Sequence, residues 1–238
     1  MNLLAFELGY KALNEKIRSA NEDVVIDKCF GERFIGSGAS DKTITINGTP
    51  GNALGVYLDG ATIVVNGNAQ DAVGDTMNDG KIVVNGNAGD ALGYAMRGGK
   101  IFVRGNAGYR TGIHMKQYKD KRPVLVVGGS AGSFLGEYLA GGLIVILGLD
   151  TDKFPAGNFI GTGMHGGEIY LRTDKVPKNL PKQVSMSKAT EDDVEKLKDV
   201  LSEYANDFNL DINEILGKNF YRLTPNAKNP YKQLYTEN

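Results

Sequence analysis

Glycine and hydrophobic residues recur along this chain with a period of 19 residues, which two insertions lengthen near residues 117–121 and 149–155. One column holds glycine in all seven repeats, at Gly36, Gly55, Gly74, Gly93, Gly112, Gly136 and Gly161. A first apolar column holds Ile44, Ile63, Ile82, Ile101, Leu125, Ile144 and Ile169, and a second one, two residues further on, holds Ile46, Val65, Val84, Val103, Val127, Ile146 and Leu171. Residues two apart point to the same face of a β-strand, so the pattern predicts one strand in every repeat.

A third apolar column lies between the glycines and the strands, and we interpret its members as interior residues: Ala39, Leu58, Met77, Met96, Met115, Leu139 and Met164. A unit of 19 residues is too short for a helix pair and buries its apolar side only by stacking on its neighbours. Asparagine columns, Asn47, Asn66 and Asn85 and then Asn68, Asn87 and Asn106, are expected to stack at the turns. The sequence therefore predicts an all-β solenoid over residues 29–172: a right-handed parallel β-helix of about seven coils with terminal α-helical appendages.

The segment before the repeats, residues 1–28, is predicted to be an N-terminal helical cap, with its helix around residues 10–20. Its opening apolar run is broken at once by Glu7, which is not typical of a signal peptide. No window approaches the roughly eighteen apolar residues of a membrane span. We expect a cytoplasmic protein without a membrane partner.

The segment after the repeats, residues 173–238, is predicted to be a linker followed by C-terminal helices. Pro177 and Pro181 flank the linker, and Thr190 stands as an N-cap before an acidic first turn and an apolar stripe at helical spacing. A second short helix is expected over residues 212–218. We expect these segments to cap the open ends of the strand ladder or to dock a partner.

The residues between the two apolar strand columns point outward, and most of them are also apolar: Thr45, Val64, Val83, Phe102, Val126, Val145 and Tyr170. Large apolar patches are rarely left in water. The outer face is therefore expected to be covered by the chain's own terminal helices or by another protein. It also lacks the row of carboxylates that a carbohydrate-cleaving β-helix would need.

Composition narrows the range of functions. With 27 Lys and Arg against 28 Asp and Glu, the formal charge is -1, which does not favour a nucleic-acid partner. Glycine, at 32 residues, is about twice its average frequency. The single cysteine, Cys29, excludes an internal disulfide and any Cys-rich metal site, in keeping with a reducing compartment.

Candidate chemistry is sparse, and we predict no catalytic, cofactor-binding or metal-binding residues. The spacing G-x-x-G-x-x-x-G at residues 86–93 differs from the dinucleotide fingerprint and recurs along the chain with the 19-residue period, so we assign structural corners to the seven glycines of the first column. The stretch 126–132 is the nearest mimic of a phosphate loop. His114 and His165 have no second ligand at metal spacing, and Ser130 and Ser133 have no nearby histidine.

One further feature is a basic insertion that contains Lys116, Lys119, Lys121 and Arg122. It is interpreted as a solvated loop, with recognition of a partner as the alternative.

The repeats resemble those of a known family. Residues 86–93, 105–108, 136–148 and 161–167, together with the tail Phe220–Pro225, are similar to the C-terminal β-helix domain of the glutamate synthase large subunit, which is named for its glycine motif. The resemblance covers roughly residues 25–235. It implies that the domain occurs here as a free-standing polypeptide. The glycine-repeat subunit of formylmethanofuran dehydrogenase resembles the same repeat.

The resemblance implies a non-catalytic scaffold subunit of a split glutamate synthase. Its partners would be a glutamine amidotransferase subunit and a synthase subunit, and FMN and iron–sulfur clusters would lie in those partners and not in this chain. Asn2 follows Met1 where an amidotransferase would have its cysteine nucleophile. The alternatives are the glycine-repeat subunit of a formylmethanofuran dehydrogenase-like complex and a free-standing β-helix protein of other function. Self-association is left open.

Overall fold

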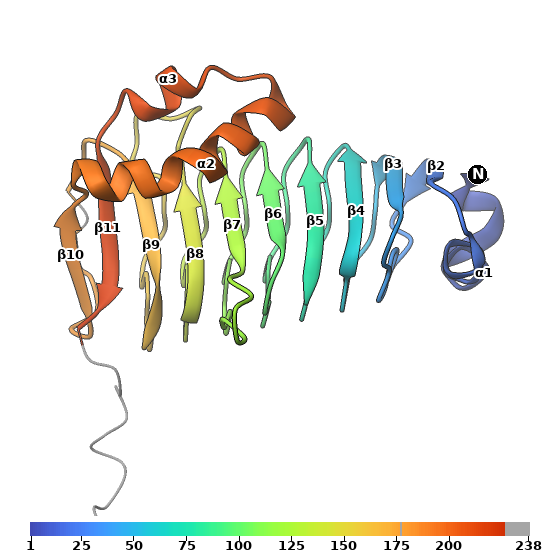
Figure 1. The fold of residues 1–238 in the computed structure, drawn as a ribbon, viewed down its shortest axis with the longest axis horizontal. Coiled ribbons are helices and arrows are strands. Elements are labelled where there is room, and N and C mark those ends of the chain that lie inside the picture. Colours follow the sequence, from blue (N-terminus) through green and yellow to red (C-terminus); the bar gives the residue numbers. More distant parts are fainter. Residues whose placement is uncertain (177, 227–238) are drawn as a thin grey trace, which may run out of the picture.

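The computed structural model describes residues 1–176 and 178–226. Within these ranges the strands form a single, mainly parallel sheet of 11 strands in the order β1-β2-β3-β4-β5-β6-β7-β8-β9-β11-β10. The strands are β1 Asn2–Leu4, β2 Val24–Phe30, β3 Thr43–Thr49, β4 Asp59–Asn66, β5 Asp79–Val84, β6 Lys100–Val103, β7 Val124–Val127, β8 Ala140–Ile146, β9 Gly166–Arg172, β10 Val184–Lys188 and β11 Phe220–Pro225. Three helices accompany them: α1 Ala5–Ser19, α2 Glu191–Phe208 and α3 Ile212–Leu216. Figure 1 shows the strands side by side in one long row.

The two apolar columns predicted from the sequence are confirmed as rows of paired residues across β3 to β9. Ile44 pairs with Ile63, and Ile46 with Val65, and this register continues from strand to strand up to Ile169 and Leu171 in β9. All members of both columns are buried in one core cluster that extends through all repeats. The third column is buried as well, except for Ala39 in the first repeat, which is only partly buried. This arrangement is compatible with a β-helix.

The glycine column lies in turn segments whose backbone alternates in sign of φ. In the repeat at Gly55, for example, Ala53, Gly55 and Tyr57 all have a positive φ, between 57° and 65°. The Gly55 N–H donates to Ile35 of the preceding repeat, whereas the Tyr57 N–H donates to Asp75 of the next one. Each turn is thus bonded to both of its neighbours.

A positive φ alone does not explain why the middle position is glycine in every turn, since most of the flanking positions with positive φ carry side chains. A Cβ at Gly55 would point into the core and lie 2.6 Å from Cδ1 of Ile82. The flanking residue Tyr57 instead projects into solvent and is 56% exposed. Inward crowding therefore selects glycine at the middle position.

The two asparagine columns stabilise the stack in different ways. Asn47, Asn66 and Asn85 form a ladder of side-chain amides, with Asn66 donating to Asn47 over 2.8 Å. In the other column each side-chain oxygen accepts a backbone N–H from the next repeat, as Asn68 does from Asn87 at 2.8 Å. The first ladder thus links side-chain amides to one another, and the second satisfies backbone N–H groups at the turns.

The N-terminal segment differs in part from the prediction of a helical cap. The helix starts at Ala5, earlier than predicted, and Gly9 interrupts it with φ 65° and ψ 166°. The parallel strands also begin before residue 29, because β2 pairs with β3 and β1 pairs with β2. Lys42 fixes the end of the helix by donating to the carbonyl oxygens of Ile17 and Ala20 over 3.0 and 2.5 Å.

The C-terminal segment contains two strands that the prediction of a linker and helices did not include. β11 pairs antiparallel with β9, and β10 pairs antiparallel with β11. The reason is the open edge of β9, which the returning chain covers with a strand. α2 begins after Thr190, the predicted N-cap, which forms a capping box with Asp193. α3 ends at Leu216, two residues before the predicted end at 218. Pro177 and the residues after Asn226 lie outside the described ranges.

The outward apolar column is covered by the chain's own C-terminal helices, the first of the two expected outcomes. Phe102, Val126, Val145 and Tyr170 are buried in a second core cluster with residues of α2 and α3. In Figure 1, α2 crosses the C-terminal half of the sheet and leaves β2 to β4 uncovered. Val64 and Thr45, on these first strands, are accordingly only partly buried.

Ion pairs fix α2 at the border of the covered region. Lys81 of β5 contacts Glu203 at 2.9 Å and Asp207 at 2.5 Å, and Lys100 of β6 contacts Glu203 at 2.5 Å. At the other end of the helix, Arg222 of β11 contacts Asp193 at 3.3 Å and also pairs with Glu168 of β9. These charges join the helix to three different strands.

Candidate interaction surface

The glycine-rich stretch 126–132, the nearest mimic of a phosphate loop, is in close contact with the protein itself. A Cβ at Gly128 would overlap the Tyr204 hydroxyl and the Arg104 carbonyl oxygen, and one at Gly129 would overlap the Asn106 side chain. Ser130 donates its N–H to Asn106, and the Ser133 hydroxyl accepts the N–H of Asn158. Close packing between repeats and beneath α2 accounts for both glycines.

The two histidines lie in different surroundings. The imidazole of His114 stacks on Tyr138 with ring centroids 5.0 Å apart and meets the edge of Tyr94 at 5.9 Å. His165 lies near the Gly163 carbonyl oxygen, 3.3 Å from Nδ1. In residues 1–176 and 178–226, no group of three or more His, Cys, Asp or Glu side chains is arranged to hold a metal ion.

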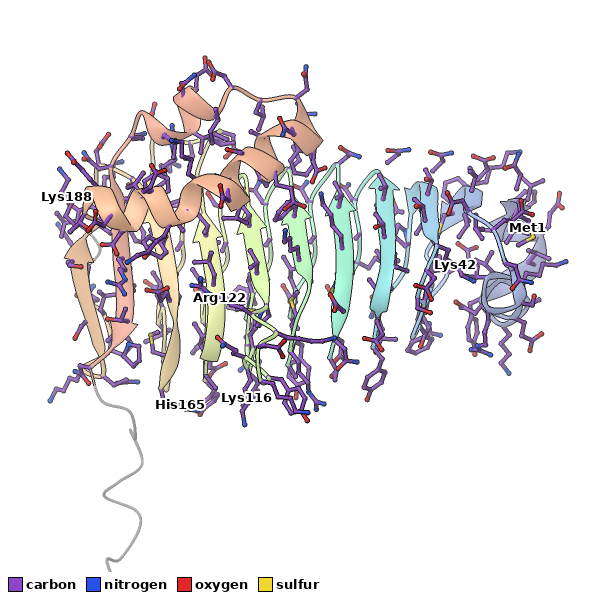
Figure 2. The ribbon with its side chains drawn as sticks, in the orientation of Figure 1. Met1, Lys42, Lys116, Arg122, His165 and Lys188 are labelled. Atoms are coloured by element: carbon purple, nitrogen blue, oxygen red, sulfur yellow. The ribbon has the colours of Figure 1, made fainter. Side chains whose placement is uncertain are left out.

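Part of the basic insertion makes intramolecular contacts. Lys121 contacts Asp79 at 3.0 Å and Asp59 at 3.8 Å, and Arg122 contacts Glu168 at 2.7 Å. The insertion thus links β4, β5 and β9, which lie on both sides of it. Lys116 and Lys119 remain exposed, and Figure 2 shows Lys116 and His165 at the edge of the sheet where the strands begin.

Cys29 is fully buried in the core cluster. Burial, followed by a hydrogen bond with Glu32, raises the pKa of its thiol to about 12. The thiolate is the nucleophilic form of cysteine, so this environment disfavours nucleophilic chemistry at Cys29.

The turn segments of successive repeats stack into a continuous surface that we call the corner ridge, comprising residues 33–38, 52–57, 71–76, 90–95, 109–114, 133–138 and 158–163. Its backbone is fixed by a pair of bonds that is repeated in the first six segments. The N–H groups of the second and the sixth residue both donate to the next repeat, as in Ala72 to Asp90 and Thr76 to Tyr94. Equivalent side chains therefore lie in rows along the stack.

Large aromatic side chains gather on this ridge. Phe34, Tyr57, Tyr94, Tyr109 and Phe159 are all between 39% and 56% exposed. Phe134 stacks on Phe159 with centroids 5.0 Å apart, and the Arg110 guanidinium lies over the Phe134 ring at 5.5 Å. Tyr, Phe and Arg are the residue types enriched at protein interfaces.

The charge of the ridge varies along its length. In its C-terminal half, Arg110 is paired with the buried carboxylate of Glu137 at 3.0 Å. Its middle bears Asp71, Asp75 and Asp90, and none of these has an ion pair among the residues that the structure describes. The ridge is thus acidic in the middle, with Arg110 beyond that stretch and Arg33 before it.

Sequence reasoning did not identify this surface. Its aromatic residues come from different columns in different repeats, so no column is aromatic throughout. The only sequence signal is the set of large residues at the turn positions that flank the glycine column.

Among the residues described, no helix is both long and apolar enough to cross a membrane. A search of solved structures finds a chain of the formyltransferase/hydrolase complex (FhcABCD) from Methylorubrum extorquens, solved with methylofuran. That chain aligns with a TM-score of 0.62 and 22% identity, over 82% of this chain and 71% of its own length, which shows a shared fold.

Among curated proteins, an uncharacterized protein of Methanocaldococcus jannaschii is 45% identical, over 98% of this chain and 95% of its own length. The model of the GXGXG motif family matches residues 13–228. This match includes all seven glycines of the corner column and extends through α2 and β11. The protein is therefore a member of the GXGXG motif family.

Proposed function

We propose that this protein is a non-catalytic scaffold subunit of a multisubunit complex of the formyltransferase/hydrolase kind. This was the alternative in the sequence analysis, where it followed from the resemblance to the glycine-repeat subunit of formylmethanofuran dehydrogenase. The observation that carries the proposal is the corner ridge, a rigid, hydrogen-bonded surface with exposed aromatic side chains. Exposed aromatic residues on a rigid framework are suited to holding another protein.

The likeness to a chain of the FhcABCD complex supports this choice of assembly, because it extends over 82% of the chain. The glutamate synthase scaffold, with its amidotransferase and FMN and iron–sulfur partners, stays a prediction from the glycine motif. The relatives described above do not add support for it. The C-terminal helices cover the chain's own outer face, which gives them a role within this chain.

Further details of the fold belong to the same proposal. We assign residues 29–172 to the coils of a right-handed β-helix, with residues 1–28 and 173–238 as flanking segments, and the seven corner glycines to structural positions without catalytic or binding roles. The proposal places catalytic groups and cofactors in the partner subunits and the complex in the cytoplasm.

The test is purification of the native protein from its source cells in mild salt, followed by mass spectrometry of what co-elutes. Recovery with formyltransferase or hydrolase subunits supports the proposal. Recovery with amidotransferase and synthase subunits would instead support a split glutamate synthase. A protein that elutes alone, as a single chain or as a homo-oligomer, contradicts both assignments.

A further inference from the structure

We infer that a cavity beside α1 binds the carboxylate or phosphate group of a small ligand. The cavity has a volume of about 420 Å³, and its walls are Asn14, Ile17 and Arg18 of α1 together with residues 36–40 and Lys42 of the first repeat. None of these residues is acidic. Figure 2 shows Lys42 on the first repeat, next to α1. The inference goes beyond the scaffold function and does not depend on it.

Two backbone N–H groups of the cavity wall have no acceptor. In all six later repeats the N–H of the corner glycine donates to the preceding repeat, as Gly55 does to Ile35 at 2.8 Å. The N–H four positions after the glycine also donates to the preceding repeat, as that of Asp59 does at 3.0 Å. Gly36 and Ser40 hold these positions in the first repeat. Neither N–H donates to any group in the part of the chain that the structure describes.

These N–H groups are directed towards α1, because α1 takes the place of a preceding repeat. The Asn14 amide donates to the Arg33 carbonyl oxygen at 2.9 Å, and the equivalent carbonyl of Asn52 accepts an N–H of the preceding repeat. Unlike a repeat, α1 presents side chains and not backbone carbonyl oxygens to Gly36 and Ser40. The two donors therefore open into the cavity, where a ligand can accept from them.

Two cationic side chains line the same cavity. Lys42 donates to the carbonyl oxygens of Ile17 and Ala20, which uses two of its three N–H groups and offsets the partial negative charge at this end of α1. Arg18 has no ion pair among the described residues. Hydrogen bonds from a guanidinium and from backbone N–H groups to a carboxylate or phosphate are charge-assisted and therefore strong.

The cavity also contains an acceptor, which narrows the choice of ligand. The Ser37 carbonyl oxygen is equivalent to that of Val56, which accepts the N–H of Gly38 in the preceding repeat, so it too is directed towards α1. The hydroxyl groups of Ser37 and Ser40 can donate or accept. Two cations and two backbone donors outweigh one carbonyl, so an anion is favoured over a metal ion. A ligand with a hydroxyl beside its charge, such as hydrogen phosphate, would satisfy the carbonyl as well.

The test is a titration of the full-length protein with inorganic phosphate and, separately, with acetate, at an ionic strength held constant with sodium chloride. Backbone amide signals are followed by NMR. We expect saturable shifts centred on Gly36 and Ser40 with at least one of the two anions. A response to phosphate alone identifies a phosphate ligand, and a response to acetate alone identifies a carboxylate ligand.

Three variants locate the binding. Arg18→Gln should weaken it at least about fivefold, because it removes the charge-assisted bonds of the guanidinium. The control Lys16→Gln removes the same charge from an exposed position of α1 outside the cavity, and it should bind like the wild type. Ser40→Asp should abolish binding by repulsion, and the next repeat already carries Asp59 at this position. Thermal unfolding verifies that each variant folds, and Arg18→Gln decides if Ser40→Asp does not.

The inference is overturned if neither anion shifts the Gly36 and Ser40 signals, or if the shifts do not saturate and spread over the whole protein surface. It is also overturned if Arg18→Gln and Lys16→Gln weaken binding equally, since net charge and not the cavity would then attract the anion. None of these results bears on the scaffold function, because the titration involves no partner protein.

Discussion

The hydroxyl of Tyr204 on α2 donates a 3.2 Å hydrogen bond to the carbonyl oxygen of Val103 at the end of β6. Its ring meets Phe102 edge to face, with centroids 5.6 Å apart. Burial raises the pKa of this phenol well above its ordinary value, so it remains a hydrogen-bond donor at neutral pH. One residue thus binds the C-terminal helix to the outer face of the sheet by both a polar and an apolar contact.

Removal of this hydroxyl should destabilise the protein measurably. Tyr204→Phe is expected to lower the free energy of unfolding by about 1 kcal/mol, because the Val103 carbonyl loses a buried donor. Tyr204→Ala is expected to cost about 3–5 kcal/mol, because it also leaves a cavity beside Phe102. Urea unfolding measures both, with Tyr109→Phe on the exposed ridge as the neutral control. Equal stability of Tyr204→Phe and the wild type would contradict the role of the bond.

The corner glycines should be intolerant of a side chain. Gly93 has φ 68°, and a Cβ there would lie 2.8 Å from Cδ1 of the buried Leu125. Gly93→Ala is expected to cost about 2–4 kcal/mol from backbone strain and core crowding together. The matched control is Ala91→Gly, two residues earlier with φ 54°, which should change stability by less than about 1 kcal/mol. Comparable losses in both variants would show that crowding is not what selects glycine.

Thr111 is the polar member of a buried apolar position occupied by Val73 and Leu92 in the preceding repeats. It is fully buried and donates to the Gly108 carbonyl oxygen at 3.1 Å, which also accepts the N–H of Gly132. Thr111→Val keeps the shape and leaves that oxygen with a donor, so we expect stability to stay equal or rise by up to about 1 kcal/mol. A loss above that size in thermal unfolding would contradict the prediction.

Attachment of α2 should weaken in acid. Burial opposes the ionisation of Glu203, but hydrogen bonds from Lys100 and Lys81 outweigh it and hold the pKa of Glu203 below its ordinary value. A carboxyl with a lowered pKa in the folded state contributes stability above its unfolded pKa, about 4.3, and loses it as the pH falls through the folded value. Glu203→Gln should therefore reduce the decline in unfolding free energy between neutral pH and about pH 3. Glu195→Gln, at an exposed site, should leave that decline unchanged.

Cys29 should report global unfolding. Because it is fully buried and its thiol has a pKa of about 12, it should not react with a thiol reagent while the protein is folded. Reaction should appear in denaturant, with a midpoint equal to that from circular dichroism. Rapid labelling of the native protein would show that the N-terminal repeats open separately.

The sequence predicted the central repeats well and their boundaries less well. β2 was not recognised because its register to β3 shifts between Ile26 and Cys29, so its apolar residues are one position out of phase with the 19-residue period. β11 was not recognised because an antiparallel strand of six residues, inserted between β9 and β10, has no repeat to mark it.

The candidate site was the least predictable part. The ridge contacts, such as His114 on Tyr138 and Arg110 over Phe134, join residues whose separation in sequence varies with the insertions. Their positions in the turns follow from the period, but the exposure and stacking of the rings depend on how neighbouring turns pack. The sequence indicated that these turns require glycine, but it did not indicate that they form an interaction surface.

The repeat by itself determined the strand register, the buried columns and the glycine turns, because identical residues at a fixed period can be buried together only by stacking. The tertiary structure decided the rest. It showed that α2 covers the outer face, that β10 and β11 close one end of the sheet, and that the basic insertion pairs with acids on distant strands. These contacts join residues that are far apart in the sequence, such as Tyr204 and Val103 at a separation of 101 positions, and no local pattern encodes which of the available apolar and charged surfaces will meet.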